Sequence, residues 1–252
     1  MKRFRIATYN IHKAQGLDGR VRVERIARVL AEIDADIIAL QEVVSEEGRS
    51  IEHHQASYLA EQFGYFCAIG ETRKHRGAIY GNVTLSRWKF ELVRPVDLTV
   101  PGREERGALR TDIRLDDRLL HIFNLHLGTA HAERKSQAVR LVDEEVLRAI
   151  DISGPRVVLG DFNEWTHGLV TQKLSAEFQG TRLINHVRRT RAYPAVLPLL
   201  NLDHIYLDQQ LRIQKAFYHR KPLSRIASDH LPLVADVVFE QAAHLRPLDK
   251  SS

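Results

Sequence analysis

Short apolar runs that end in polar residues recur from one end of the chain to the other. The run Val157–Leu159, for example, lies between Pro155 and Gly160, and Asp161 follows it directly. A run of this length with such boundaries is typical of a short buried strand. The same pattern predicts further strands at 4–11, 35–43, 65–70, 81–87, 90–98, 108–115, 118–128, 202–207, 213–219 and 231–239.

Segments with helical spacing of apolar residues separate several of these strands. They lie at 23–33, 53–64, 132–150 and 168–178, and the third is the longest. No repeat or low-complexity linker divides the chain. Strands interleaved with helices throughout predict an α/β fold in one layered domain over residues 1–240, with residues 241–252 as a C-terminal tail.

Composition narrows the class of protein. With 252 residues, of which 44% are hydrophobic, the chain can bury a large core, and its one cysteine rules out an intrachain disulfide. No apolar stretch approaches membrane-spanning length and the N-terminus is too polar for a signal peptide, so we expect a cytoplasmic protein. The net charge of +5 favours an anionic partner, which is nucleic acid, a membrane surface or a small phosphorylated substrate.

Polar side chains cluster at the ends of six predicted strands. One such residue indicates a turn or a helix cap, whereas six indicate a site, because strand ends in layered α/β folds converge on one edge of a sheet. The residues concerned are Asn10, Gln41 with Glu42, Asn124 with His126, Asp161 with Asn163, Asp203 with His204, and Asp229 with His230.

This set of side chains is suited to phosphodiester hydrolysis. Glu42, Asp229 and the neutral oxygen of Asn10 offer a sparse set of oxygen ligands of the kind that Mg²⁺ prefers. The reaction needs a base for the water, positive charge for the phosphoryl oxygens and a proton for the leaving group. Two histidines, a carboxylate pair and a metal ion supply all three.

The motifs "YN", "LQE", "GDFN" and "SDH" occur in this order along the chain. Over residues 3–239 the sequence resembles the endonuclease/exonuclease/phosphatase superfamily, in its deoxyribonuclease/sphingomyelinase-like branch. The resemblance implies a four-layered α/β sandwich, in which two mixed β-sheets pack face to face with helices on the outside. It also implies a divalent-metal-dependent phosphoesterase that uses Mg²⁺ or Mn²⁺.

The resemblance assigns roles to residues that match its motifs. Glu42 is the principal metal ligand, with Asn10 and Asp229 nearby. Asp161 orients or deprotonates the attacking water, His230 contacts the phosphate or acts as the base, and Asp203 fixes the tautomer of His230. The residues implied to bind the phosphate or the leaving group are His126, Asn163, Asn124, Asn82 and Arg106. For Asn82 a turn residue, and for Arg106 a surface charge, remain equally open interpretations.

Two departures from the family's motifs bear on the number of metal ions and on the substrate. The position two after Asn10 is His12, where some members carry an acidic residue, so a second metal there is doubtful. The segment "NLHLG" is unlike the Tyr-containing segment of abasic-site endonucleases. The second departure argues against a DNA-repair enzyme. We expect a monomer that acts on a phospholipid headgroup or a small phosphorylated molecule. The alternatives are a DNA or RNA nuclease and a non-catalytic binding scaffold.

Overall fold

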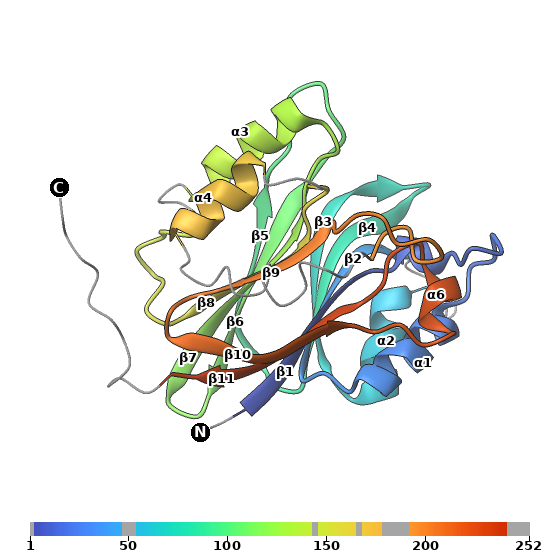
Figure 1. Ribbon diagram of the computed structural model, residues 1–252, viewed down its shortest axis with the longest axis horizontal. Helices are drawn as coiled ribbons and strands as arrows, with labels where there is room; N and C mark the ends of the chain where they lie inside the picture. The colour runs from blue at the N-terminus through green and yellow to red at the C-terminus, as the bar shows by residue number, and fades with distance from the viewer. Residues whose placement is uncertain (1–2, 47–53, 143–145, 165–167, 178–191, 241–252) are drawn as a thin grey trace.

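Two β-sheets packed face to face form the centre of the computed structural model, which describes residues 3–46, 54–142, 146–164, 168–177 and 192–240 (Figure 1). The six-stranded sheet has the order β10-β11-β1-β2-β4-β3 and the five-stranded sheet the order β5-β6-β7-β8-β9. The strands are β1 (Arg3–Asn10), β2 (Ile37–Ser45), β3 (Phe66–His75), β4 (Ala78–Ser86), β5 (Phe90–Asp97), β6 (Gly107–Leu115), β7 (Arg118–His126), β8 (Arg156–Asp161), β9 (Asp203–Leu207), β10 (Leu211–Tyr218) and β11 (Leu233–Phe239).

Helices cover the outer face of each sheet. The six-stranded sheet is covered by α1 (Val23–Ile33) and α2 (Gln55–Phe63), and the five-stranded sheet by α3 (His131–Val142) and α4 (Leu169–Glu177). A short turn η1 (His12–Ala14) follows β1, and α6 (Ser224–Ala227) precedes β11. The expected four-layered α/β sandwich is confirmed.

The central strands are largely apolar on both faces because both faces are buried. In β2, Ile37 and Ala39 point into the core between the sheets, whereas Ile38 and Leu40 pack against α1 and α2. Side chains alternate between the faces of a strand, so one continuous apolar run serves two layers. This explains why these strands appear in the sequence as unbroken apolar runs.

The direction of the strands brings their polar ends to one edge. β1 runs parallel to β2 and β7 runs parallel to β8, whereas the other neighbouring strands are antiparallel. His126 and Asp161 are paired at the ends of β7 and β8, and Asp161 is paired with Asp203 at the start of β9. β6 begins opposite His126, so Arg106, one residue earlier, lies at this edge as well.

The helix predicted over 132–150 is shorter in the structure. It ends at Val142, and residues 146–148 form turns. The amide of Leu147 bonds to the carbonyl of Leu141, a spacing that no α-helix uses, while Val146 and Leu147 still pack into the core beneath α3. The apolar pattern thus continues beyond the helix because burial continues.

One expected feature, the C-terminal tail at 241–252, lies outside the described residues. In the part of the chain that the structure describes, no helix has the length and apolar character needed to span a membrane.

Candidate active site

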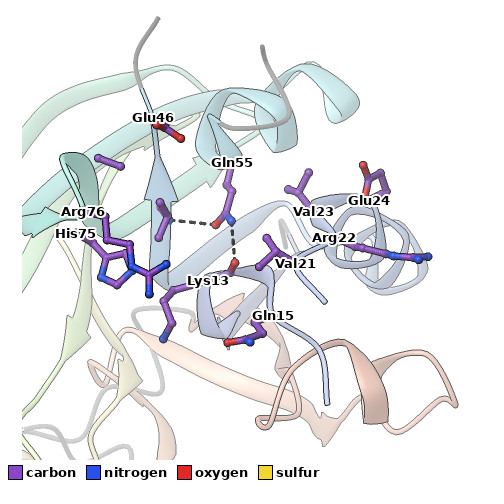
Figure 2. Close-up of a pocket in the computed structure, with 12 residues that line it drawn as sticks. Lys13, Gln15, Val21, Arg22, Val23, Glu24, Glu46, Gln55, His75 and Arg76 are labelled. Atoms are coloured by element: carbon purple, nitrogen blue, oxygen red, sulfur yellow. Dashed lines mark hydrogen bonds between the residues drawn. The ribbon is translucent and has the colours of Figure 1, made fainter. Parts of the chain in front are cut away.

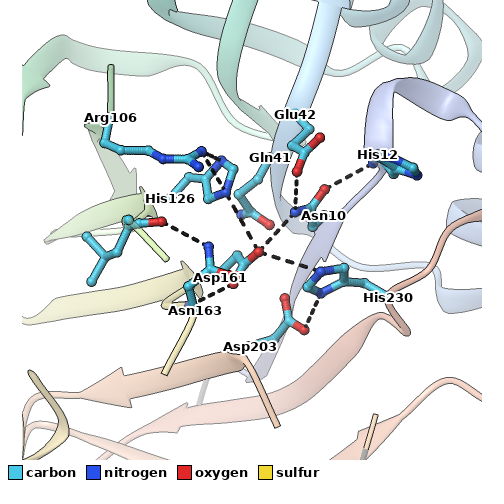
Figure 3. Close-up of polar contacts among 12 residues, drawn as sticks. Asn10, His12, Gln41, Glu42, Arg106, His126, Asp161, Asn163, Asp203 and His230 are labelled. Atoms are coloured by element: carbon cyan, nitrogen blue, oxygen red, sulfur yellow. Dashed lines mark hydrogen bonds and ion pairs between the residues drawn. The ribbon is translucent and has the colours of Figure 1, made fainter. Parts of the chain in front are cut away.

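One carboxylate oxygen lies at the centre of the polar edge. Asp161 is 1% exposed, and its Oδ2 lies 3.0 Å from Nδ2 of Asn10, 3.8 Å from Nε2 of His126 and 3.6 Å from Nε2 of His230 (Figure 3). These four side chains come from β1, β7, β8 and the segment before β11. The structure therefore brings together residues up to 220 positions apart in the sequence, from Asn10 to His230.

The backbone around Asp161 fixes its orientation. Oδ1 of Asp161 accepts a hydrogen bond of 2.9 Å from the amide of Asn163, which has a left-handed φ of 48°. Nδ2 of Asn163 donates to the carbonyl of Leu127 at 2.9 Å and so ties the loop after β8 to the loop after β7. Such an Asx turn holds the carboxylate without using Oδ2. Oδ2 remains directed at the cluster.

Glu42 is held in an unusual backbone conformation. The pairing of β2 with β4 shifts register between Leu40 and Val43, and Glu42 within this bulge has φ 55°. Bulges of this kind redirect a side chain, often next to a functional site. Here the bulge places Oε1 of Glu42 3.1 Å from Nδ2 of Asn10, and Oε2 lies 2.7 Å from Nζ of Lys13.

Glu42 is ionised at neutral pH. Burial acts to raise the pKa of this carboxyl group, but the opposing effects of His126, the Lys13 ammonium and the Asn10 amide lower it to about 2. Because the pKa of His126 is itself only about 4, that ring is neutral at pH 7 and Lys13 is the cation that accompanies the Glu42 carboxylate.

His230 carries a positive charge. Its Nδ1 lies 2.9 Å from Oδ2 of Asp203, which is 2% exposed. Burial acts to lower the pKa of this imidazole, yet the carboxylates of Asp203, Asp161 and Asp229 together raise it to about 10. The hydrogen bond to Asp203 orients the ring, and as an imidazolium it donates from Nε2 toward the centre of the cluster.

His126 has the opposite character. Nη1 of Arg106 lies 3.0 Å from Nε2 and 3.1 Å from Nδ1 of this imidazole. Burial, together with the Arg106 guanidinium, lowers the pKa of His126 to about 4, so the ring carries no charge at pH 7. Two histidines beside one aspartate are thus held in different charge states, a pattern that separates their chemical roles.

The three expected metal ligands lie on the six-stranded side of the site. Asn10 and Glu42 are in contact, and the Asp229 carboxylate lies 3.7 Å from Nδ1 of His12. Among the described residues, no group of three or more His, Cys, Asp or Glu side chains is arranged to hold a metal ion. Mg²⁺ nevertheless commonly binds through one or two carboxylates, with water and substrate completing its shell.

The donor set fits such a sparse site. Oε2 of Glu42 already faces a cation, the Lys13 ammonium at 2.7 Å, so the position beside this oxygen favours positive charge. The carboxylate is ionised. Oδ1 of Asn10 accepts a hydrogen bond of 3.0 Å from the backbone amide of His12 and has a second lone pair that can serve as a neutral oxygen ligand of a hard divalent ion.

Asn124 and Asn82 lie beneath the site rather than in it. Asn124 is fully buried, and its Nδ2 donates to the carbonyls of Leu40 and Val83, both at 3.0 Å. Its Oδ1 accepts from Nε2 of Gln41 at 2.8 Å. Nδ2 of Asn82 donates to the carbonyls of Gly107 and Asn124. Both amides join the two sheets, and both amide hydrogens of Asn124 are used in doing so.

Two residues near the site carry no recognisable sequence signal. Lys13 pairs with Glu42, and the ring of Tyr193 lies 4.8 Å from the ring of His230. Burial and the nearby carboxylates of Asp229 and Asp161 raise the pKa of Tyr193. Lys13 reaches the site from the turn η1, where its φ is 60°, and Tyr193 reaches it from the loop before β9; local periodicity contains no information about either path.

A polar cavity opens beside the cluster. It has a volume of about 820 Å³ and shares Lys13 with the site (Figure 2). His75 at the end of β3 and Arg76 in the following turn lie on one side of it, and Gln55 at the start of α2 bonds to the carbonyl of Lys13. A cavity of this size accommodates a substrate group next to a reacting centre.

The sequence profile described as the Endonuclease/Exonuclease/phosphatase family matches residues 7–230 of the chain. A curated relative, the uncharacterized protein YbhP of Escherichia coli (strain K12), is 28% identical over 250 residues, covering 93% of this chain and 96% of YbhP.

Solved structures share the fold. An endonuclease/exonuclease/phosphatase family protein from Bacteroides thetaiotaomicron superposes with a TM-score of 0.77 at 17% identity, covering 97% of this chain and 98% of that one. The mannosyl-6-phosphatase Bt3783 of Bacteroides thetaiotaomicron gives a TM-score of 0.73 at 16% identity, covering 94% of this chain and all of that one (100%).

Proposed function

The chain belongs to the Endonuclease/Exonuclease/phosphatase family, and from this premise we propose that it is a divalent-metal-dependent phosphoesterase. We propose that it hydrolyses a phosphodiester by attack of an activated water. The observation that carries the proposal is the position of Asp161, whose Oδ2 lies within 4 Å of the Asn10 amide and of both His126 and His230. A buried carboxylate between two histidines of different charge suits proton transfer next to a phosphate.

In this proposal the two sheets supply different functions. Glu42, Asn10 and Asp229, on the six-stranded side, would hold Mg²⁺ or Mn²⁺. When bound, the ion supplies positive charge that stabilises the phosphoryl oxygens. Asp161, on the five-stranded side, orients the water and accepts its proton. Its Oδ2 accepts a hydrogen bond of 3.0 Å from the Asn10 amide, and since a carboxylate oxygen can accept two, it has capacity for a water.

The other side chains stabilise charge. The His230 imidazolium donates from Nε2 to a phosphoryl oxygen while Asp203 holds its Nδ1. Neutral His126, held by Arg106, donates a hydrogen bond to the leaving oxygen. The side-chain Nδ2 of Asn163 carries two hydrogens and donates one of them to the carbonyl of Leu127. The other hydrogen would contact the scissile phosphate. Such preorganised donors act most strongly in a site that excludes water.

A phospholipid headgroup or a small phosphorylated molecule is the substrate class that we favour. The cavity next to Lys13 has room for one such group. The described residues show no track of alternating basic and aromatic side chains of the kind that single-stranded nucleic acids stack on. The net charge of +5 is the observation that favours the alternative, a nuclease.

Hydrolysis of bis-p-nitrophenyl phosphate tests the reaction. The purified protein should release nitrophenol with Mg²⁺ and lose this activity in excess chelator. Glu42→Gln and Asp161→Asn should each lower kcat at least about 100-fold, as expected for groups that act on the reacting atoms. Glu61→Gln on the exposed face of α2 is the matched control and should leave kcat unchanged.

Three outcomes separate the alternatives. Full activity in chelator contradicts metal dependence. Nicking of plasmid DNA at a higher kcat/KM than release of a phospholipid headgroup identifies a nuclease. If calorimetry detects no Mg²⁺ binding by the folded protein and no ester is hydrolysed, the chain is a binding scaffold, since a fold by itself does not guarantee activity.

A further inference from the structure

Exposed apolar side chains gather beside the candidate active site. The structure describes ten large apolar residues that are exposed, and three of them occupy four consecutive positions: Val196 at 60%, Leu197 at 66% and Leu199 at 50%. Two more, Leu17 and Ile226, are joined by a hydrogen bond of 3.0 Å from the Leu17 amide to the Ile226 carbonyl. We call these five residues the apolar rim.

The loop that carries Val196, Leu197 and Leu199 is closed at its base. The amides of Ala192 and Tyr193 both donate to the carbonyl of Leu200, at 2.8 and 2.9 Å, and the amide of Leu199 donates back to Tyr193 at 2.8 Å. A loop closed in this way keeps its apolar side chains in water, which is unfavourable in free energy, because those side chains cannot fold back onto the core.

Both parts of the rim are connected to the segment that carries Asp229 and His230. The amide of Ala195, adjacent to Val196, donates to the carbonyl of Asp229 at 2.8 Å, and Tyr193 packs on His230. Ile226 is three residues before Asp229, so their Cα atoms are at most about 10 Å apart. The loop with Val196 is therefore bonded to Asp229 through its neighbour Ala195, and Ile226 lies three residues from Asp229 along the chain.

Basic side chains accompany the rim. Lys221 and Arg225 are exposed near Ile226, and the Lys221 ammonium lies 3.7 Å from the Glu32 carboxylate. A third cation, Lys13, lines the cavity. Apolar side chains that project from a basic surface are the pattern by which peripheral proteins bind anionic membranes, with the apolar groups in the interface and the cations near the lipid phosphates.

We propose that the apolar rim docks the protein onto a bilayer that contains anionic phospholipid, with the catalytic residues facing the lipid headgroups. Val196, Leu197 and Leu199 enter the interface, while Lys221 and Arg225 contact lipid phosphates. The inference rests on the proposed function only in making the lipid the substrate; the docking itself does not require catalysis.

Flotation with vesicles tests the docking. The full-length protein is mixed with vesicles of phosphatidylcholine and phosphatidylglycerol in a 3:1 ratio. The wild type should float with these vesicles more than with pure phosphatidylcholine vesicles. The double variant Val196→Ser/Leu197→Ser should bind at least tenfold more weakly while its kcat on bis-p-nitrophenyl phosphate stays unchanged. Circular dichroism confirms that the variant is folded.

Ile150→Ser is the matched control. Ile150 is also exposed. It is five residues before Pro155, whose carbonyl accepts a hydrogen bond from the amide of His121 in the first half of β7. The candidate site lies at the other end of this strand, at His126. This variant should bind vesicles as the wild type does. Equal loss in both variants would show that exposed apolar area in general, and not the rim, drives binding, and would overturn the proposal.

Three further outcomes separate the docking proposal from the proposed function. A wild type that hydrolyses bis-p-nitrophenyl phosphate but does not float with the mixed vesicles overturns the docking and leaves the proposed function intact. Floating that depends on Leu197, in a protein that hydrolyses no ester, supports the docking and contradicts the proposed function. If light scattering shows a dimer that becomes a monomer in the double variant, the rim is a subunit interface and the proposal is overturned.

Discussion

Glu42 has two features that are unfavourable in a folded protein. Its carboxylate is largely buried, and its backbone has the left-handed φ of 55° that residues other than glycine avoid. The left-handed conformation costs about 1–2 kcal/mol for a residue with a Cβ atom. Strained residues of this kind concentrate at functional sites, and here the strain directs the carboxylate toward Asn10 and Lys13.

A pair of variants separates the backbone cost from the side-chain role. Glu42→Ala and Glu42→Gly both remove the carboxylate, but only the glycine relieves the left-handed strain. We expect Glu42→Gly to be more stable than Glu42→Ala by about 1 kcal/mol in urea unfolding, with both inactive. Equal stabilities, or a less stable glycine variant, would show that position 42 is not strained.

A second residue-scale prediction concerns the orientation of His230. Asp203→Asn replaces an acceptor for Nδ1 by a group that can also donate, so the ring loses its fixed orientation. We expect kcat on bis-p-nitrophenyl phosphate to fall about 100-fold with little change in KM. Asp117→Asn, in the exposed turn between β6 and β7, is the control. An Asp203→Asn variant with normal kcat would exclude this aspartate from the reaction.

Sequence patterns identify the residues at strand ends better than those on loops. Asp161, His126 and Asp203 stand at positions where the strand register alone places them together. Such patterns do not identify Lys13 and Tyr193, because their contacts depend on the conformation of a turn and of a loop. Asn124 was expected to contact phosphate, yet its amide joins the sheets, because a motif does not say which layer a buried amide faces.

At the scale of elements, the packing of β8 against β7 depends on a glycine. Gly160 has φ 147°, and a Cβ atom there would lie 2.0 Å from the carbonyl oxygen of Leu125. β7 ends with His126 and β8 with Asp161, so a separation of these strands would displace both of these proposed catalytic side chains.

Gly160→Ala tests this contact. We expect a loss of about 1–3 kcal/mol in unfolding free energy from overpacking, together with reduced kcat. Gly77→Ala, in the turn between β3 and β4, also changes a glycine with positive φ but has no atom within 4 Å of the added Cβ. It should lose only about 1 kcal/mol and keep its activity. Similar losses in both would contradict the role of the β7–β8 contact.

An ion cluster connects β1 and β11 and makes stability depend on pH. Asp236 accepts from Arg3 at 2.6 Å and from Arg5 at 2.8 Å. Burial acts to raise the pKa of Asp236, but the two guanidinium groups lower it below its ordinary value of 3.8. Its stabilising contribution is therefore complete above pH 3.8 and is lost as the pH falls through the lowered pKa of the folded state.

Asp236→Asn should destabilise the protein by about 1–3 kcal/mol at pH 7, the range for hydrogen bonds to charged groups. The difference from the wild type should shrink below pH 3.8, where the wild-type carboxyl also becomes neutral. Urea unfolding at a series of pH values measures this. A difference that does not change with pH would show that the charge of Asp236 contributes nothing.

Element type follows well from the sequence, but element ends do not. The helix expected over 132–150 ends at Val142, whereas Val146 and Leu147 are buried in a turn, with the Leu147 amide bonded to the Leu141 carbonyl. Apolar spacing reports burial, and a buried turn such as that at Leu147 satisfies the same pattern.

For the whole molecule, the contact between the sheets is polar beneath the site. Asn124 on β7 bonds to Leu40 on β2 and Val83 on β4, and so joins the five-stranded sheet to the six-stranded sheet. Asn124→Ala removes one hydrogen bond from each of these two buried carbonyls. We expect a loss of about 2–6 kcal/mol in unfolding free energy, since each buried group that loses its partner costs about 1–3 kcal/mol.

Activity should fall with stability in this variant, because Asn10 and Asp161 reach each other across the two sheets. The substitution Thr111→Ala offers a comparison, since the hydroxyl of this buried residue on β6 has no hydrogen-bond partner among the described residues. It should change stability far less. An Asn124→Ala variant as stable as the wild type would show that the sheets are held by apolar packing alone.

The attachment of the loop that bears Leu197 has an evolutionary consequence. The proposed catalytic groups lie on strand ends whose pairing is part of the sheets, whereas this loop contacts them through Ala195 and Tyr193. Related proteins can therefore differ in this loop, and with it in the molecule that they recognise, while they retain the same side chains at the strand ends.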